Sequence, residues 1–211
     1  MCCILIQYSL ATDYAKLASL AQERYGTNAH NTILQLQAKI NELRNASDIE
    51  KLKGINDFFN NQIKFDDDMS IWGQQDYWAT PLEMIGKGRG DCEDFTIGKY
   101  VFLRELNIPN DKLKLTYVKV QIGGPYSKIF QAHMVLSYYA TPTAEPLILD
   151  NLIGDIRQAS RRSDLTPIFS FNSEGLWVGG ENSGKTDSIN NLSRWRDVLQ
   201  RIQADGIEQS N

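Results

Sequence analysis

The chain has 211 residues, 42% of them hydrophobic and 23% charged, and its 22 basic against 26 acidic residues leave a net charge of −4. This length suits one domain with a sizeable buried core. The acidic balance argues against a nucleic-acid binder that relies on phosphate contacts, and no apolar run reaches the ~18 residues that a membrane span needs. Composition also excludes collagen-like, disordered and disulfide-framework classes, so we expect a soluble globular domain.

Few residues are available for zinc or disulfide chemistry. The cysteines and histidines are Cys2, Cys3, Cys92, His30 and His133. They form no set of four ligands with the spacing of a structural zinc site. The apolar start at 1–12 lacks the basic residues of a complete signal peptide, so a remnant of a signal segment and an irregular N-terminus are equal interpretations. We expect a single domain over 13–211.

Three helical patterns open the domain. Apolar residues at helical spacing predict helices over 12–26 and 33–43, and a third helix begins after Ser47 and continues to Phe59. Ser47 and Glu50 have the spacing of a capping box, in which each side chain accepts a hydrogen bond from the other residue's backbone. These helices are expected to cover a core, and His30 to be a surface or capping residue.

The periodicity then fails over 65–90, a stretch that combines aromatic residues, glycines and the acidic run 66–68. A long connection of this kind inside a regular chain is often functional. The acidic run could contribute metal ligands, but we expect it to be a solvated loop. A helix follows over 92–106 and completes a helical part at 13–106.

The chain becomes extended after Pro109. Branched and aromatic residues predict strands over 113–122, 130–140 and 147–153, with short extended pieces at 168–171 and 176–178. These form a sheet part at 111–178, and an amphipathic helix follows at 193–203. Helices first and strands later, without regular alternation, predict an α+β fold with an antiparallel sheet.

Cys92 is the candidate nucleophile because it follows Gly90-Asp91 at the start of a predicted helix. Unpaired N–H groups and the positive end of the helix dipole would stabilise a thiolate there. The flanking Asp91, Glu93 and Asp94 oppose this effect, so ionisation requires a basic partner.

His133 supplies that partner, on the strand face that it shares with Val135 and Ser137, and Asp150 follows on the next strand. Asp150 would accept a hydrogen bond from the ring of His133 and leave the other ring nitrogen for Cys92. A nucleophile, a base and an orienting carboxylate are the arrangement for acyl transfer through a thioester.

These residues resemble the transglutaminase-like cysteine protease superfamily, and within it the bacterial transglutaminase-like cysteine proteinases, the LapG-like periplasmic proteases. The resemblance covers 65–177 and is carried by Asp76-Tyr77-Trp78-Ala79-Thr80-Pro81, Gly90-Asp91-Cys92-Glu93-Asp94, Ala132-His133-Met134-Val135 and Leu149-Asp150-Asn151. It implies a papain-like core, with the cysteine at the N-terminus of a helix that packs on an antiparallel sheet bearing the histidine and the aspartate. Cys92 would be the nucleophile, His133 the general base and then acid, and Asp150 the residue that orients it.

The resemblance also implies a biological role. Proteases of this family are periplasmic endopeptidases that cut a large surface adhesin near its N-terminus, at a di-alanine site, and so release biofilm attachment. Their usual inhibitor is an inner-membrane receptor for cyclic di-GMP, which binds the protease through its periplasmic domain. Calcium is the implied cofactor, bound by the acidic residues that flank the cysteine, here Asp91 and Glu93; several oxygen ligands are what calcium prefers. The Cys92 N–H would form part of the oxyanion hole, and a side-chain donor from 74–78 is unassigned.

Two alternatives stay open. A transglutaminase or other acyltransferase would use the same triad with a different acceptor, and a non-catalytic peptide-binding module would use only the fold. The segment 179–186 also satisfies the phosphate-loop pattern G-x-x-x-x-G-K-[ST]. A phosphate-loop fold needs further strands after this motif, and too few residues follow it. We therefore interpret 179–186 as a surface turn.

Overall fold

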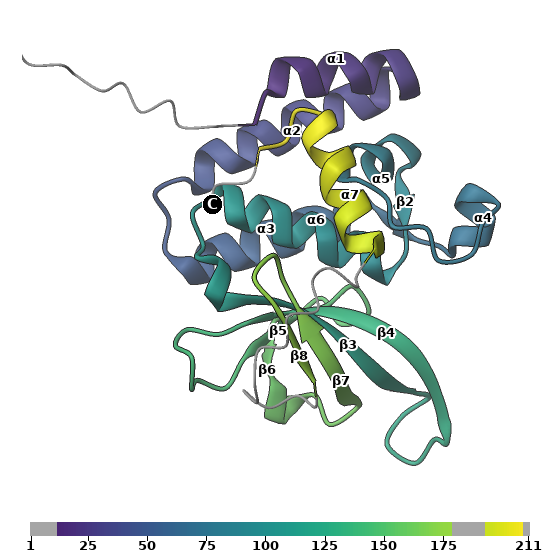
Figure 1. Cartoon of the computed structure of the whole chain (residues 1–211), viewed down its shortest axis with the longest axis vertical. Coiled ribbons are helices and arrows are strands. Elements are labelled where there is room, and N and C mark those ends of the chain that lie inside the picture. The colour runs from purple at the N-terminus through teal and green to yellow at the C-terminus, as the bar shows by residue number, and fades with distance from the viewer. Residues whose placement is uncertain (1–11, 179–192, 209–211) are drawn as a thin grey trace, which may run out of the picture.

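The computed structural model describes residues 12–178 and 193–208, and within them a layer of helices lies on one side of an antiparallel sheet (Figure 1). The α+β architecture predicted from the order of the elements is confirmed. The signal segment predicted within 1–12, with Cys2 and Cys3, begins outside the described residues, and so does the phosphate-loop pattern. No helix of the described residues is long and apolar enough to cross a membrane.

The helical layer begins with three amphipathic helices. They are α1 (Tyr14–Tyr25), α2 (Thr27–Leu43) and α3 (Asp48–Gln62). Ser47 and Glu50 form both hydrogen bonds of the predicted capping box at the start of α3. His30 is a structural residue, because its Nδ1 lies 3.0 Å from the carbonyl oxygen of Ala18.

The stretch 65–90 is more regular than its sequence predicts. It contains α4 (Asp68–Trp72) and α5 (Pro81–Lys87), and the short strands β1 (Lys64–Phe65) and β2 (Arg89–Gly90) pair in parallel at its ends. The helices are too short to show an apolar period, since each has fewer than three turns. The Asp67 and Thr80 side chains cap them. β2 directly precedes α6 (Cys92–Glu105), which packs against the sheet.

The sheet has six strands in the order β6-β5-β4-β3-β7-β8. Its members are β3 (Leu113–Ile122), β4 (Ile129–Tyr138), β5 (Leu147–Leu149), β6 (Arg157–Gln158), β7 (Leu165–Phe171) and β8 (Leu176–Val178). Single 3-10 turns, η1 (Asn110–Lys112) and η2 (Ala159–Arg161), precede β3 and follow β6. The predicted strand over 147–153 is too long: β5 ends at Leu149 because the Asp150 side chain accepts a hydrogen bond from the Leu152 N–H, which turns the chain.

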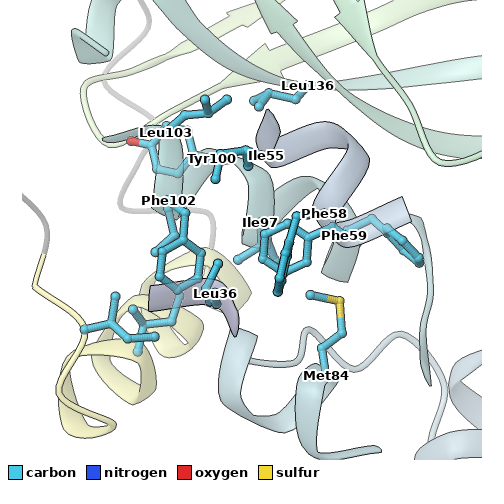
Figure 2. Packing of buried hydrophobic residues seen from close by; sticks show 14 of the residues in the cluster. Leu36, Ile55, Phe58, Phe59, Met84, Ile97, Tyr100, Phe102, Leu103 and Leu136 are labelled. Carbon is cyan, nitrogen blue, oxygen red and sulfur yellow. The ribbon is translucent and has the colours of Figure 1, made fainter. Parts of the chain in front are cut away.

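The main core lies between the helices and the sheet. Figure 2 shows how Phe58, Phe59, Ile97 and Met84 meet where α3, α6 and α5 pack together, while Tyr100 and Leu103 approach the sheet near Leu136. The smaller cluster of Val118, Val135 and Ile148 lies on the opposite face of the sheet. α7 (Ser193–Ala204) completes the helical layer and buries Trp195.

Candidate active site

Cys92 is the first residue of α6, and the residue before it caps the helix. The Asp91 carboxylate accepts hydrogen bonds from the N–H groups of Glu93 and Asp94, while the Asp94 side chain accepts one from the Asp91 N–H. This capping box leaves the N–H of Cys92 without a partner inside the helix. The backbone at Cys92 is therefore free to donate a hydrogen bond to an oxyanion.

The surroundings of Cys92 favour the protonated thiol over the thiolate. Burial raises its pKa far above the usual range, and the negative charges of Glu93 and Asp91 act in the same direction. The Sγ–H donates to Glu93 Oε2 at 2.7 Å, and the Tyr117 hydroxyl lies 3.3 Å from the other Glu93 oxygen. The proton of the nucleophile is thus hydrogen-bonded to Glu93. Activation of Cys92 therefore requires that this hydrogen bond breaks.

Cys92 meets the sheet at the edge of β4. The Thr96 hydroxyl, one turn along α6, donates to the carbonyl oxygen of Met134 at 3.2 Å, and the Met134 N–H acts on the thiol by lowering its pKa. Both backbone groups of Met134 therefore point toward α6. His133 precedes this contact residue, which brings the predicted base next to the strand edge where Cys92 lies.

His133 and Asp150 form the predicted pair. His133 Nε2 lies 2.8 Å from Asp150 Oδ1, and both residues are buried. Strand pairing places His133 opposite Val118, on the face of Val118 and Val135, as its sequence pattern predicts. Because Nε2 faces Asp150, Nδ1 is the ring nitrogen left for proton exchange with a nucleophile.

Arg162 belongs to the site, although no pattern in the sequence predicts it. Its Nη2 donates to the second oxygen of Asp150 at 2.7 Å, and its Nε donates to Asp164 at 3.0 Å. Burial alone would raise the pKa of Asp150, but the hydrogen bonds from His133, Leu152 and Arg162 lower it to about 2. Asp150 is thus ionised and held in place. No local signal identifies Arg162, because it follows η2 and reaches Asp150 only through the tertiary fold.

Lys99 adds a second buried basic group on the side of α6. Its side chain is buried over the ring of Phe95. Burial lowers its pKa to about 7, and the charges of Asp150 and Asp57 oppose that shift. Asp150 thus lies among buried basic groups that favour its ionised form.

An acidic cluster lies directly beside the nucleophile. Oxygen atoms of Asp68, Asp91 and Asp94 all lie within 4.8 Å of one another. Burial and repulsion by neighbouring carboxylates raise the pKa of all three groups. Asp68 Oδ1 is buried and has no hydrogen-bond partner. Crowded carboxylate oxygens with an unpartnered atom fit a hard divalent cation, which prefers oxygen ligands and offsets their repulsion.

The structure corrects the expectation for the acidic run 66–68, which is not a solvated loop. Asp66 pairs with Arg89 at 2.7 Å, and Asp67 caps α4. Asp68 is buried, and its Oδ2 accepts a hydrogen bond from the Tyr77 N–H at 2.5 Å. The hydrogen bond from Tyr77 joins the later part of the stretch 65–90 to α4. Of the acidic run 66–68, Asp68 is the residue that belongs to the cluster.

Of the two predicted metal ligands, the structure brings only Asp91 into this cluster. Glu93 instead contacts Cys92 and Tyr117, so a role for it as a ligand stays a prediction. Ala79, the residue that follows the 74–78 segment, donates its N–H to Asp94 of the cluster at 2.7 Å. Within that segment, Gln75 lines the pocket at Cys92 and is a candidate side-chain donor for the oxyanion hole.

Known proteins resemble this chain over most of its length. The family model described as bacterial transglutaminase-like cysteine proteinase BTLCP matches residues 23–177, a range that includes Cys92, His133 and Asp150. Solved structures of LapG from Legionella pneumophila are 38% identical to this chain. The EGTA-treated form has a TM-score of 0.78 and covers 92% of this chain and 100% of its own. The calcium-bound form has a TM-score of 0.74, with 90% and 98% covered. No curated protein matches the chain.

Proposed function

The chain belongs to the bacterial transglutaminase-like cysteine proteinase family, and from that premise we propose that it is a calcium-dependent periplasmic endopeptidase. Its substrate is a large repeat adhesin, cut in the N-terminal region at a di-alanine site, so that cleavage releases the adhesin and ends biofilm attachment. The partner that inhibits it is the periplasmic domain of an inner-membrane cyclic di-GMP receptor. The observation that carries the proteolytic activity is the buried His133–Asp150 pair beside the strand edge where Cys92 lies.

The proposed reaction is acyl transfer through a thioester. His133 Nδ1 takes the proton of Cys92, and the thiolate attacks the scissile carbonyl to form a tetrahedral oxyanion. The Cys92 N–H donates to this oxygen. His133 then gives the proton to the leaving amine as the C–N bond breaks. Water, deprotonated by His133, attacks the thioester, and the thiol leaves with the proton returned.

Asp150 keeps His133 in the tautomer and orientation that these steps require. It stabilises the imidazolium that forms when His133 takes the proton, and it does so while remaining ionised, since its pKa is about 2. Arg162 in turn holds the second oxygen of Asp150 at 2.7 Å. The general base is thus oriented by a chain of buried contacts rather than by solvent.

Calcium fits the residues next to the nucleophile. Asp68, Asp91 and Asp94 would hold the ion, since their oxygens are already close and Asp68 Oδ1 is unpartnered. Bound calcium supplies positive charge that offsets the carboxylates around Cys92. The calcium-bound form of LapG supports this choice of metal. Asp91, which caps α6 and precedes Cys92, would link the ion to the position of the nucleophile.

The test is proteolysis of a recombinant adhesin N-terminal fragment that contains a di-alanine site. Wild type in calcium should cleave it, whereas Cys92→Ala in calcium and wild type in chelator should not. Cys92→Ser, which keeps the size of the side chain, serves as the matched control for folding, and thermal unfolding checks both variants. Cleavage that survives chelation would remove the calcium dependence but keep the triad.

An excess primary amine in the same assay separates hydrolysis from acyl transfer. The endopeptidase should release a free carboxylate, whereas an acyltransferase would incorporate the amine into the product. Absence of cleavage by wild type in calcium would contradict the proposed substrate.

A further inference from the structure

A protease that cuts a polypeptide needs a surface that holds the chain on both sides of the scissile bond. We propose that the substrate binds as an added strand along the free edge of β4, at 129–133, and so presents its scissile bond to Cys92. This inference rests on the proposed proteolytic function and specifies the class of segment that the enzyme accepts.

β4 is paired along its whole length on one side only. On one side β3 pairs with its whole length, from Ile129 to Tyr138, but on the other side β5 reaches only Leu136 to Tyr138. In the part of the chain that the structure describes, no strand covers the other side of 129–135. In Figure 1 this part of β4 lies at the outside of the sheet. An unpaired strand edge is a template for another extended chain.

The backbone groups along the free edge of β4 point toward the nucleophile helix. Met134 turns its carbonyl oxygen toward Thr96, away from β3. In an antiparallel ladder, backbone groups alternate between the two sides with a period of two residues. Ala132 and Phe130 therefore direct their N–H and C=O groups to the same free side as Met134. These groups form a row that leads directly to the thiol.

A groove lies beside this row of backbone groups. An open pocket of about 360 Å³ has Cys92 and Ala132 among its lining residues, together with Phe65 and Met69. The small side chain of Ala132 leaves room for a substrate chain next to the sulfur. The groove thus joins the free edge of β4 to the nucleophile.

The composition of the groove defines the substrate class. Its apolar lining residues are exposed, Phe65 by 57% and Met69 by 52%, and Ile129 at the start of β4 is 61% exposed. Asp67 and Asp76 also line it, with the acidic residues that flank Cys92. Apolar surface favours apolar substrate residues, and the carboxylates repel acidic ones. The expected substrate segment is extended, apolar or basic, and free of Asp and Glu near the scissile bond; a helical segment cannot form the strand bonds.

The experiment is a backbone N-methylation scan of a peptide substrate. A ten-residue peptide with a central di-alanine bond is made in versions that each carry one N-methyl group, which removes one N–H donor. With wild-type enzyme in calcium, we expect the KM to rise about fivefold or more at alternate residues and less than twofold at the residues between them, since a strand edge bonds every second residue. A scan without this alternation would overturn the inference and leave the proposed function intact.

Variants of the enzyme test the same hydrogen bonds by changing the backbone of β4 instead of the peptide. Ala132→Pro removes an N–H that points away from β3, a position where an edge strand tolerates proline. We expect Ala132→Pro to keep the unfolding midpoint within a few degrees of wild type and to raise the KM of the unmodified peptide about fivefold or more. Phe130→Pro, which lies further from the thiol, should also raise this KM. Unchanged KM in both variants would contradict the inference. If wild type cleaves neither the peptide nor the adhesin fragment, the proposed function fails, and the inference fails with it.

Discussion

Asp150 is the residue on which the geometry of the candidate base depends. One oxygen faces His133 and also accepts the Leu152 N–H, while the other accepts a hydrogen bond from Arg162. The Asn60 amide holds its backbone carbonyl at 2.8 Å. A buried carboxylate with all these contacts has one orientation, and that orientation selects the tautomer of His133.

We predict that Arg162→Met destabilises the protein strongly. Loss of one partner leaves the other charge buried without compensation, and breaking a buried pair in this way costs about 3–5 kcal/mol. The expected result is a lower free energy of unfolding in urea at pH 7. Arg157→Met is the matched control, since the Arg157–Asp155 pair is exposed and such pairs contribute about 1 kcal/mol or less.

The pH dependence of the same measurement gives a second readout. The pKa of Asp150 is depressed in the folded protein, from 3.8 to about 2, so its ionisation contributes stability above pH 3.8 that is lost as the pH falls toward 2. Because Arg162 contributes to this shift, Arg162→Met should lose less stability over that range than wild type. An equal loss in both proteins would show that Arg162 does not set the ionisation of Asp150.

At the scale of elements, α6 packs against the sheet and against other helices at the same time. Its first turn carries the nucleophile against the edge of β4, and its middle packs closely on α3 and α5. Gly98 permits this approach, because a Cβ atom there would lie 2.9 Å from Met84 Cε and 3.0 Å from Phe59 Cε1 (the side chains of Figure 2). The position of the nucleophile therefore depends on a close contact almost two turns away.

We predict that Gly98→Ala lowers the free energy of unfolding, although alanine is the better helix former. Helix propensity favours alanine by about 1 kcal/mol, but overpacking of a filled core costs about 1–3 kcal/mol, so we expect a net loss of up to about 2 kcal/mol. Urea unfolding measures it. Gly154→Ala is the control, since its Cβ would meet only Asn60 Nδ2 at 3.9 Å. A stabilised Gly98→Ala protein would show that α6 shifts freely against Met84 and Phe59.

At the scale of the whole molecule, the acidic cluster joins segments that are far apart in the chain. Asp68 belongs to α4, whereas Asp91 and Asp94 belong to the start of α6. Ala79, between them in sequence, binds Asp94. A cation bound here would hold the connection 65–90 against the nucleophile helix, so calcium should affect global stability as well as catalysis.

We predict that calcium raises the thermal unfolding midpoint relative to chelator. A ligand at 100 times its Kd stabilises the folded state by about 2.7 kcal/mol, which corresponds to about 5–10 °C for a chain of this length. Scanning calorimetry with calcium, magnesium or EGTA measures the shift. Asp68→Asn should raise the midpoint without metal, because it removes a crowded charge, and should abolish most of the calcium shift.

Asp67→Asn is the matched control for this measurement. Asp67 is the adjacent residue but caps α4 outside the cluster, and asparagine caps helices as well as aspartate. Its calcium shift should equal that of wild type. Equal shifts in both variants would place the calcium site elsewhere.

Local patterns in the sequence predicted most of the fold. The capping box at Ser47 and Glu50, the helix that begins at Cys92 and the strand that carries His133 all have signals within a few residues. These features depend on backbone hydrogen bonding and on apolar periodicity, and residues close together in the sequence determine both. The hydrogen bond between His133 and Asp150 was also predicted from neighbouring strands, and it forms.

The tertiary structure alone decided which distant side chains complete the site. Asp68 joins Asp91 and Asp94 because β1 pairs with β2, and Arg162 reaches Asp150 because the chain folds back after β6. No spacing rule predicts such contacts, since they depend on how packed elements bring remote segments together. The early end of β5 leaves the edge of β4 free, and β5 ends where the Leu152 N–H donates to the Asp150 side chain. The sequence by itself thus determined the candidate nucleophile and base, whereas long-range packing decided what surrounds them.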